Sequence, residues 1–213
     1  MELIKNLIDF ILHIDKHLFE IVTTYQSSTY LILFLIVFCE TGLVVTPFLP
    51  GDSLLFAAGT ICGLGLLNPL LLILLLFVAV FLGDNSNYFI GKNIGPRAFE
   101  GKIRFLKQEY LTKTQDFYAK HGGKTVIMAR FVPIIRTFAP FVAGIGSMTY
   151  KRFLSYSILG SILWINIFIW AGYLLGSNEF VKKNFSLVTL GIIFVSVLPV
   201  IFGLIKSKMK NEP

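Results

Sequence analysis

The sequence predicts an all-α membrane protein that crosses the bilayer several times. Of its 213 residues, 55% are hydrophobic and 15% are charged, whereas about 25% of the residues of a soluble domain are charged. Two apolar stretches, residues 30–66 and 123–149, are interrupted by prolines, and each precedes a largely apolar segment long enough to span a membrane, residues 68–92 and 153–176. Together these observations predict an inverted repeat of two re-entrant helical hairpins, each followed by a transmembrane helix.

Composition also limits the partners and cofactors of the chain. The net charge of +7 comes from basic residues between the apolar segments, a distribution typical of a cytoplasmic membrane face rather than of a nucleic-acid-binding protein. Cys39 and Cys62 lie in apolar sequence and are too few for a disulfide framework or a cysteine metal site. His13 and His17 have a spacing that would fit a metal, but a solvated helix face explains them better. We therefore expect no metal and no cofactor.

Residues 1–29 are predicted to form an N-terminal amphipathic helix along the membrane interface. Polar positions recur at intervals of three and four up to residue 24, and apolar residues fill the other side. Charged residues such as Asp9 and Glu20 interrupt this stretch, and no small-residue cleavage site follows, so we expect no cleavable signal. The side of the membrane on which this helix lies is left open.

The first hairpin is predicted over residues 30–66. Each apolar arm, residues 30–45 and 53–66, is shorter than the roughly 20 residues that a crossing helix needs. The break between the arms consists of Pro47, Pro50 and Gly51. Irregular backbone at membrane depth requires protein or water around it. Glu40 lies on the first arm and Asp52 just after the break.

The first full span, residues 68–92, carries Asp84 as a further ionisable group. Its end and the start of the next loop contain glycines spaced for close helix contact: Gly83, Gly91 and Gly95. The loop 92–124 has eight Lys or Arg residues against three acidic ones, so the positive-inside rule places it in the cytoplasm. We expect an interfacial helix over residues 99–120.

The second hairpin is predicted over residues 123–149. Its apolar arms are again short, and the predicted break contains Pro133 and Pro140. It also carries Arg130 and Arg136, although an arginine at membrane depth costs about 2.5–3.5 kcal/mol on insertion scales. The two arginines are therefore expected to line a polar cavity.

Two further spans complete the chain, residues 153–176 and 185–205. Lysines follow the last span, so the C-terminus is expected in the cytoplasm, although Lys182 and Lys183 weaken that orientation. The spans after the two hairpins share a spacing of 81 residues: Asn85, Gly91 and Gly95 match Asn166, Gly172 and Gly176. Since one span separates the first hairpin from the cytoplasmic loop, the hairpins should enter from opposite faces, as in many transporters.

The charges inside the apolar segments divide by sign. Between Glu20 and Lys92 they are all acidic: Glu40, Asp52 and Asp84. Between Lys124 and Lys151 they are both basic: Arg130 and Arg136. If the hairpin tips meet, acids of one half face arginines of the other, and pairing lowers the cost of burial. We expect Arg130 and Arg136 to face Glu40 and Asp52 near the membrane centre. Ion pairs that only hold the hairpins together are the alternative, and Asp84 has the further alternative of reaching headgroups or capping a neighbour.

The chemistry of these groups favours a transporter of an anionic lipid headgroup. An arginine keeps its charge and directs two donors at a phosphate, and backbone N–H groups at a helix break add to such a site. Buried carboxylates beside arginines suit a proton relay. The sequence contains neither a nucleophile elbow nor a phosphate-binding glycine loop, so an enzyme is the least favoured class.

The motifs resemble those of the DedA family of bacterial membrane proteins, also called the SNARE-associated or VTT-domain family. The segment RFVPIIRTFAPFVAG, residues 130–144, is similar to the signature of that family. Glu40 followed by PFLPGD is similar to its first motif, and Gly83-Asp84 with Tyr88, Gly91 and Gly95 to its third. The resemblance covers about residues 30–176, and Lys92 departs from it where an arginine is expected.

The resemblance implies two facing re-entrant hairpins and the transport of a polyprenyl-phosphate lipid, chiefly undecaprenyl phosphate, across the bacterial cytoplasmic membrane. It implies coupling to the proton motive force, with Glu40 and Asp52 as functional acids and Arg130 and Arg136 as functional arginines. Some members are associated with phosphatidylethanolamine, and others with drug or alkali tolerance. The expected partners are a lipid phosphate, membrane lipids and protons. Whether the protein forms a homo-oligomer is left open.

Three classes of function are left to distinguish. The leading hypothesis is a lipid-phosphate flippase. The second is a proton-coupled exporter of small cations or drugs, in which the arginines are only structural. The third is a membrane scaffold or assembly factor, in which the hairpin charges serve folding alone.

Overall fold

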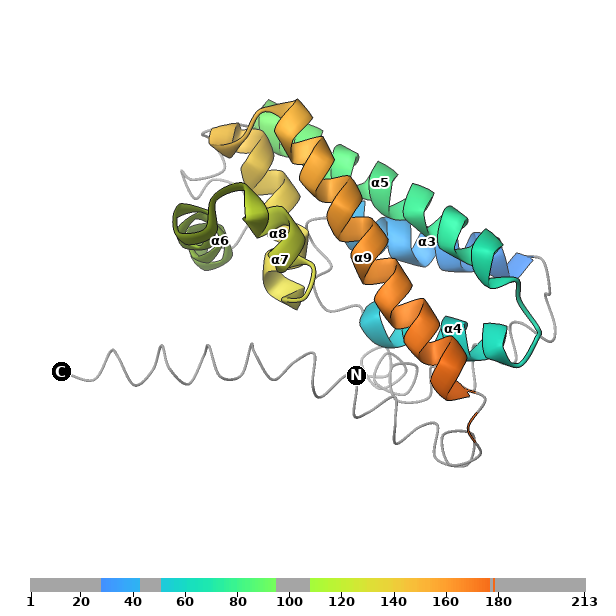
Figure 1. Ribbon diagram of the computed structural model, residues 1–213. Helices are drawn as coiled ribbons and strands as arrows, with labels where there is room; N and C mark the ends of the chain where they lie inside the picture. Colours follow the sequence, from blue (N-terminus) through green and yellow to red (C-terminus); the bar gives the residue numbers. More distant parts are fainter. Residues whose placement is uncertain (1–27, 43–50, 95–107, 177, 179–213) are drawn as a thin grey trace, which may run out of the picture.

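The computed structural model describes residues 28–42, 51–94, 108–176 and 178, and this part of the chain is helical without strands (Figure 1). The helices, in chain order, are α3 (Ser28–Gly42), α4 (Gly51–Gly63), α5 (Pro69–Ile94), α6 (Gln108–His121), α7 (Thr125–Ala129), α8 (Pro133–Val142) and α9 (Tyr150–Gly176). A 3-10 turn, η2 (Gly122–Lys124), precedes α7, and a π-helical turn, η3 (Ala143–Ser147), follows α8. The all-α prediction is confirmed for these residues.

Two long helices, α5 and α9, form the centre of the molecule. Both have a 26-residue stretch that is long and apolar enough to cross a membrane, and at 1.5 Å per residue such a stretch is about 39 Å long. They contact each other and run side by side (Figure 1). They correspond, within three residues at each end, to the predicted spans 68–92 and 153–176.

Shorter helices flank the two long ones. The first pair, α3 and α4, has 15 and 13 residues, fewer than the roughly 20 needed to cross a bilayer. Between α8 and α9 the chain turns at Gly146, whose φ of 130° favours glycine. Gly51 is the first residue of α4, and Pro133 takes the first position of α8, where its missing N–H is no loss.

One predicted break differs from the structure. Pro140 lies inside α8, which continues to Val142, so the helix does not end at this proline. The interruption precedes Pro133 instead, where Val132 has extended backbone. Residues before a proline are disfavoured in the helical region, and this effect places the break one residue before Pro133.

Several predicted features lie outside the described residues. They are residues 1–27 of the N-terminal helix, the break residues Pro47 and Pro50, Gly95, the first part of the predicted helix 99–120, and the span 185–205. Of the predicted interfacial helix, the structure describes α6. Its Tyr118 hydroxyl donates a hydrogen bond to the Ala139 carbonyl of α8 at 2.9 Å, and burial raises the pKa of this phenol, which keeps the donor protonated.

The two halves of the chain pack on each other in a crossed manner. Helix α4 packs on α9, and the segment α8–η3 packs on α5. On α4 and α9, a Cβ added at Gly59 would collide with the Ile169 carbonyl, and one at Gly172 with the Phe56 carbonyl. Glycines also allow the close contact between α8–η3 and α5. Gly144 lies against the Tyr88 carbonyl, and Gly91 lies against the Phe141 carbonyl. Helix α4 therefore packs on the long helix of the second half, and α8–η3 packs on the long helix of the first half.

The buried apolar side chains form two clusters. One is formed by side chains of α3, α4, the first part of α5 and the second half of α9, and the other by side chains of α6, α7, α8, the end of α5 and the start of α9. Along α5, Asp84 lies between Val80 of the first cluster and Tyr88 of the second. A polar site thus occupies the junction of the two apolar clusters.

Candidate functional site

Arg136, on α8, is the centre of the polar site. Its side chain is 5% exposed. The Nη2 group donates to Oε1 of Glu40 on α3 at 2.5 Å, and the Nη1 group donates to Oδ1 of Asp52 on α4 at 2.6 Å. One guanidinium of α8 therefore joins α3 and α4, and acids of the first half face an arginine of the second half, as the division of charges predicted.

Trp164, on α9, contacts both Arg136 and Asp52. Its indole N–H donates to Oδ1 of Asp52 at 2.9 Å, the oxygen that also accepts from Arg136. The ring lies under the guanidinium, with 4.9 Å between Cζ and the ring centroid, a distance at which a cation–π attraction acts. Trp164 therefore fixes both partners of the Arg136–Asp52 pair.

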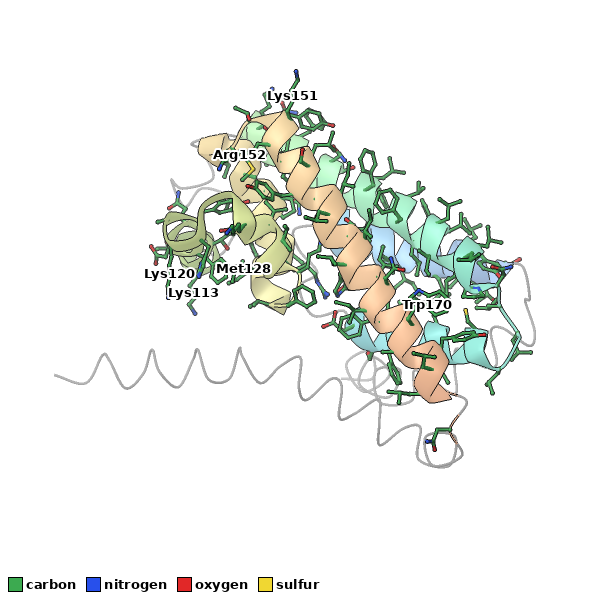
Figure 2. The ribbon with its side chains drawn as sticks, in the orientation of Figure 1. Lys113, Lys120, Met128, Lys151, Arg152 and Trp170 are labelled. Carbon is green, nitrogen blue, oxygen red and sulfur yellow. The ribbon has the colours of Figure 1, made fainter. Side chains whose placement is uncertain are left out.

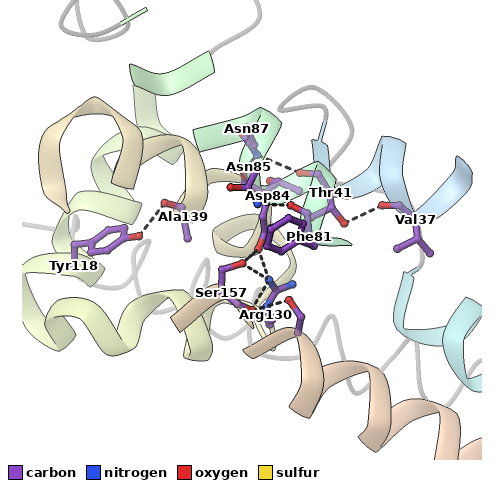
Figure 3. Close-up of polar contacts among 12 residues, drawn as sticks. Val37, Thr41, Phe81, Asp84, Asn85, Asn87, Tyr118, Arg130, Ala139 and Ser157 are labelled. Carbon is purple, nitrogen blue, oxygen red and sulfur yellow. Dashed lines mark hydrogen bonds and ion pairs between the residues drawn. The ribbon is translucent and has the colours of Figure 1, made fainter. Parts of the chain in front are cut away.

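Arg130, in the turn after α7, forms a separate ion pair with Asp84 on α5 (Figure 3). Ser157 on α9 completes this pair: its hydroxyl donates to Oδ2 of Asp84 at 2.5 Å, and its carbonyl accepts from Nη2 of Arg130 at 3.3 Å. We expected both arginines to face Glu40 and Asp52. In the structure Arg130 pairs with Asp84 instead, because the Asp84 side chain faces the interior from α5 rather than the lipid headgroups.

All five charged side chains are buried. The relative exposures are 2% for Glu40, 6% for Asp52, 1% for Asp84, 3% for Arg130 and 5% for Arg136. Burying an ion is costly unless partners compensate it, and each of these ions has at least one oppositely charged partner. Three carboxylates nevertheless face two guanidinium groups, so the fully ionised site carries one excess negative charge.

Some polar atoms of the site are left without a hydrogen-bond partner. Among the described residues these are Oε2 of Glu40, Nε of Arg130 and Oδ1 of Asn87. Native proteins satisfy most buried polar atoms with protein or ordered water. Oε2 of Glu40 and Oδ1 of Asn87 can accept a hydrogen bond, and Nε of Arg130 can donate one.

Sequence reasoning did not identify Trp164, Ser157 and Asn87 as site residues. Trp164 gives one usable signal, since it lies in the middle of a span, whereas tryptophan is enriched at the ends of spans in the interface. Ser157 and Asn87 give no such sequence signal, because small polar residues are also common at ordinary helix contacts in membranes. Their roles follow from the rotation of α5 and α9, which the sequence does not specify.

Basic side chains gather at one end of the described structure. Lys113 and Lys120 on α6 and Lys151 and Arg152 at the start of α9 lie in the same half of the view, while Trp170 lies toward the other end of α9 (Figure 2). Lys92 is exposed near the end of α5. The described residues contain no group of three or more His, Cys, Asp or Glu that could hold a metal.

Long apolar helices around a buried, charged site define a helical membrane protein whose interior contains ion pairs. The VTT domain model matches residues 49–174. The chain is 52% identical to Protein DedA of Escherichia coli strain K12, over 98% of this chain and 96% of that protein. It is 44% identical to an uncharacterized membrane protein of Mycobacterium leprae, with 79% and 76% coverage. It is also 32% identical to Inner membrane protein YqjA of E. coli strain K12, with 84% and 81% coverage.

The chain belongs to the DedA family of VTT-domain proteins, and it is a bacterial membrane protein. No solved structure matches it. The family prediction made from the hairpin motifs is thereby confirmed. Of the site residues, Asp52, Asp84, Arg130 and Arg136 lie within the matched domain, whereas Glu40 precedes it.

Proposed function

We propose that this protein is a flippase that moves a polyprenyl-phosphate carrier lipid, most specifically undecaprenyl phosphate, across the bacterial cytoplasmic membrane, with proton coupling. The observation that carries the proposal is the buried Arg136 guanidinium shared between Glu40 and Asp52. A fork of two donors directed at two carboxylate oxygens also matches two oxygens of a phosphate. No enzymatic step is included in this proposal.

Proton coupling follows from competition for the arginines. A phosphate that takes both Nη groups of Arg136 as a fork competes with Glu40 and Asp52, because both Nη groups donate to those carboxylates. Protonation removes the negative charge of a carboxylate and weakens its hold on the guanidinium. Protons entering the site thus free Arg136 for the phosphate, and their loss returns the ion pairs and expels the headgroup. The lipid tail remains in the bilayer.

The architecture proposed for this cycle is an inverted repeat of two re-entrant hairpins. The crossed glycine contacts of α4 with α9 and of α8–η3 with α5 support it, because a two-fold relation would produce such a pair of contacts. The basic end of the molecule (Figure 2) supports a cytoplasmic position for the loop 92–124. A multi-pass topology with a cytoplasmic C-terminus completes the proposal.

The test is a liposome assay with fluorescent undecaprenyl phosphate and purified protein under an imposed pH gradient. We expect the wild type to accelerate flipping, and Arg136→Ala and Glu40→Ala to lose this acceleration while accumulating in the membrane. Lys120→Ala, an exposed basic residue of α6, is the control for a general loss of positive charge. Full activity in both site variants would refute the assigned roles, and failure of all variants to accumulate would favour a scaffold.

A proton-coupled exporter of small cations or drugs is the second candidate. The excess of three carboxylates over two arginines favours it, because a net negative site attracts a cation. In that case the arginines only hold the hairpins, and Arg130→Lys is nearly harmless, whereas a bidentate phosphate site loses activity on this exchange. Competition with phosphatidylethanolamine in the same liposomes tests whether the protein flips another lipid.

The mass of the purified protein in nanodiscs establishes whether it forms a homo-oligomer.

A further inference from the structure

Asn87 on α5 joins the backbones of the two hairpins through a single amide group. Its side chain is 0% exposed. The Nδ2 group donates to the Thr41 carbonyl at 3.2 Å and to the Thr137 carbonyl at 2.7 Å; Figure 3 shows the bond to Thr41. Thr41 belongs to α3 and Thr137 belongs to α8, so the two acceptors come from different halves of the chain.

The two carbonyls flank the central ion pair. Thr41 directly follows Glu40, and Thr137 directly follows Arg136. The amide thus holds the backbone beside both partners of the bond between Arg136 Nη2 and Glu40 Oε1, which is 2.5 Å long. A shift of either hairpin that breaks this bond also stretches the bridge through Asn87.

The chemistry of the bridge requires an amide. Thr41 lies in the last turn of α3, which ends at Gly42, and carbonyls of a last turn have no helical donor of their own. A carbonyl oxygen has two lone pairs, so the one of Thr137 accepts a side-chain bond in addition to a backbone bond. An amide –NH₂ offers two hydrogens, one for each carbonyl, whereas a hydroxyl offers one.

We propose that Asn87 is a positioning residue that fixes the two hairpins at the separation at which Arg136 reaches Glu40, and so sets the paired state of the site. This inference rests on the proposed function for its role in transport, but not for the geometry that it fixes. Both hydrogen bonds that the structure gives this side chain are donated by Nδ2 to the two hairpin carbonyls.

The first test measures the distance between the hairpins without any substrate. Spin labels are attached at Leu35→Cys on α3 and Met128→Cys on α7, which are 49% and 41% exposed, in a Cys39→Ser, Cys62→Ala background in lipid nanodiscs. Electron–electron double resonance should give a narrow distribution for the parent protein. We expect Asn87→Ala to broaden the distribution or add a longer distance.

Asn166→Ala is the matched control for this measurement. Its amide donates to the Ile162 carbonyl of the same helix, α9, at 2.8 Å, so it ties no hairpin to another. We expect its distance distribution to equal that of the parent protein. An unchanged distribution in Asn87→Ala, or an equal broadening in both variants, would overturn the proposal.

A second variant separates positioning from a general folding defect. In Asn87→Asp, the protonated carboxyl retains one O–H donor, and the ionised carboxylate retains none and faces two carbonyl oxygens. We therefore expect this variant to show a broad distribution at high pH that narrows reversibly at low pH. The parent protein, which contains the same site acids Glu40, Asp52 and Asp84, is the reference at each pH. Broadening that is independent of pH contradicts the bridge.

Flipping of undecaprenyl phosphate by the same samples connects the geometry to transport. We expect Asn87→Ala to lower the rate about fivefold or more, since two buried carbonyls lose their donor, while Asn166→Ala keeps the parental rate. If the parent protein flips no lipid phosphate but Asn87→Ala still broadens the distances, the proposed substrate fails and the bridge stands. If the parent flips the lipid and the distances do not change, the bridge fails and the substrate stands.

Discussion

At the scale of single residues, the site depends on neutral side chains as much as on its ions. Trp164 and Ser157 donate hydrogen bonds to Asp52 and Asp84, and each compensates part of the cost of burying a carboxylate. A buried hydrogen bond to a charged group contributes about 1.5–3 kcal/mol. Removing a neutral donor should therefore change the activity without changing the formal charge of the site.

Trp164→Phe tests this point because it keeps an aromatic ring and removes only the indole N–H. We expect the flipping rate to fall about tenfold, which corresponds to the loss of one charged hydrogen bond. Trp164→Leu, which also removes the cation–π contact with Arg136, should lower the rate further. Both rates are measured in liposomes at equal protein content.

Trp170→Phe is the control, since the Trp170 indole is on the exposed side of α9 and donates to Asn166 of the same helix. An equal loss of activity in Trp170→Phe would show that any indole on α9 matters. The role given to Trp164 would then be wrong.

The charged residues of the site were predictable from the sequence, but their pairing was not. Charges inside apolar segments are costly, so Glu40, Asp52, Arg130 and Arg136 stand out in any pass along the chain. Asp84 was harder to place, because an acid near the end of a span has other uses. Which acid meets which arginine depends on how far each helix is rotated about its axis, and apolar sequence on all sides leaves this rotation unspecified.

At the scale of helices, the close contacts are made by glycines rather than by large side chains. Without a hydrophobic force between helices in lipid, small residues allow the backbones to approach each other closely. The spacing of Gly83, Gly91 and Gly95 was visible in the sequence and predicted close contacts, and the 81-residue match placed Gly172 at the position equivalent to Gly91. The identity of the opposing helix was not visible, because spacing on one helix carries no information about its partner.

Gly172→Ala tests the contact between α9 and α4. The added Cβ would collide with the Phe56 carbonyl, and overpacking of this kind costs about 1–3 kcal/mol. We expect a lower midpoint of thermal unfolding in detergent and a weakened Arg136–Asp52 pair, because Asp52 lies on α4. Ser155→Thr, which adds a methyl group at an exposed position of α9, should leave the midpoint unchanged, and equal shifts in both variants would contradict the contact.

At the scale of the whole molecule, the charge of the site predicts a dependence on pH. Three carboxylates against two arginines leave a repulsive charge for an incoming phosphate. Protonating a carboxylate removes both that repulsion and a competitor for Arg136. The affinity for a lipid phosphate should therefore rise as the pH falls.

Thermal-shift titrations with undecaprenyl phosphate across pH measure this dependence. We expect the wild type to bind more tightly at low pH, and Glu40→Gln to bind with a flatter pH profile because one competing carboxylate is already neutral. Glu109→Gln, in the basic loop predicted to be cytoplasmic, should retain the wild-type profile. Tighter binding at high pH would reverse the sign of the proposed coupling.

The crossed packing of the two halves also has a consequence for how the protein is made. Helix α4 makes its most extensive contact with α9, so this partner is synthesised roughly a hundred residues later, or about 5–20 s later at typical translation rates. During that interval Asp52 has neither Arg136 nor Trp164 beside it. The ion pair of Asp52 with Arg136 can therefore form only after α8 has been made, and its hydrogen bond from Trp164 only after α9 has been made.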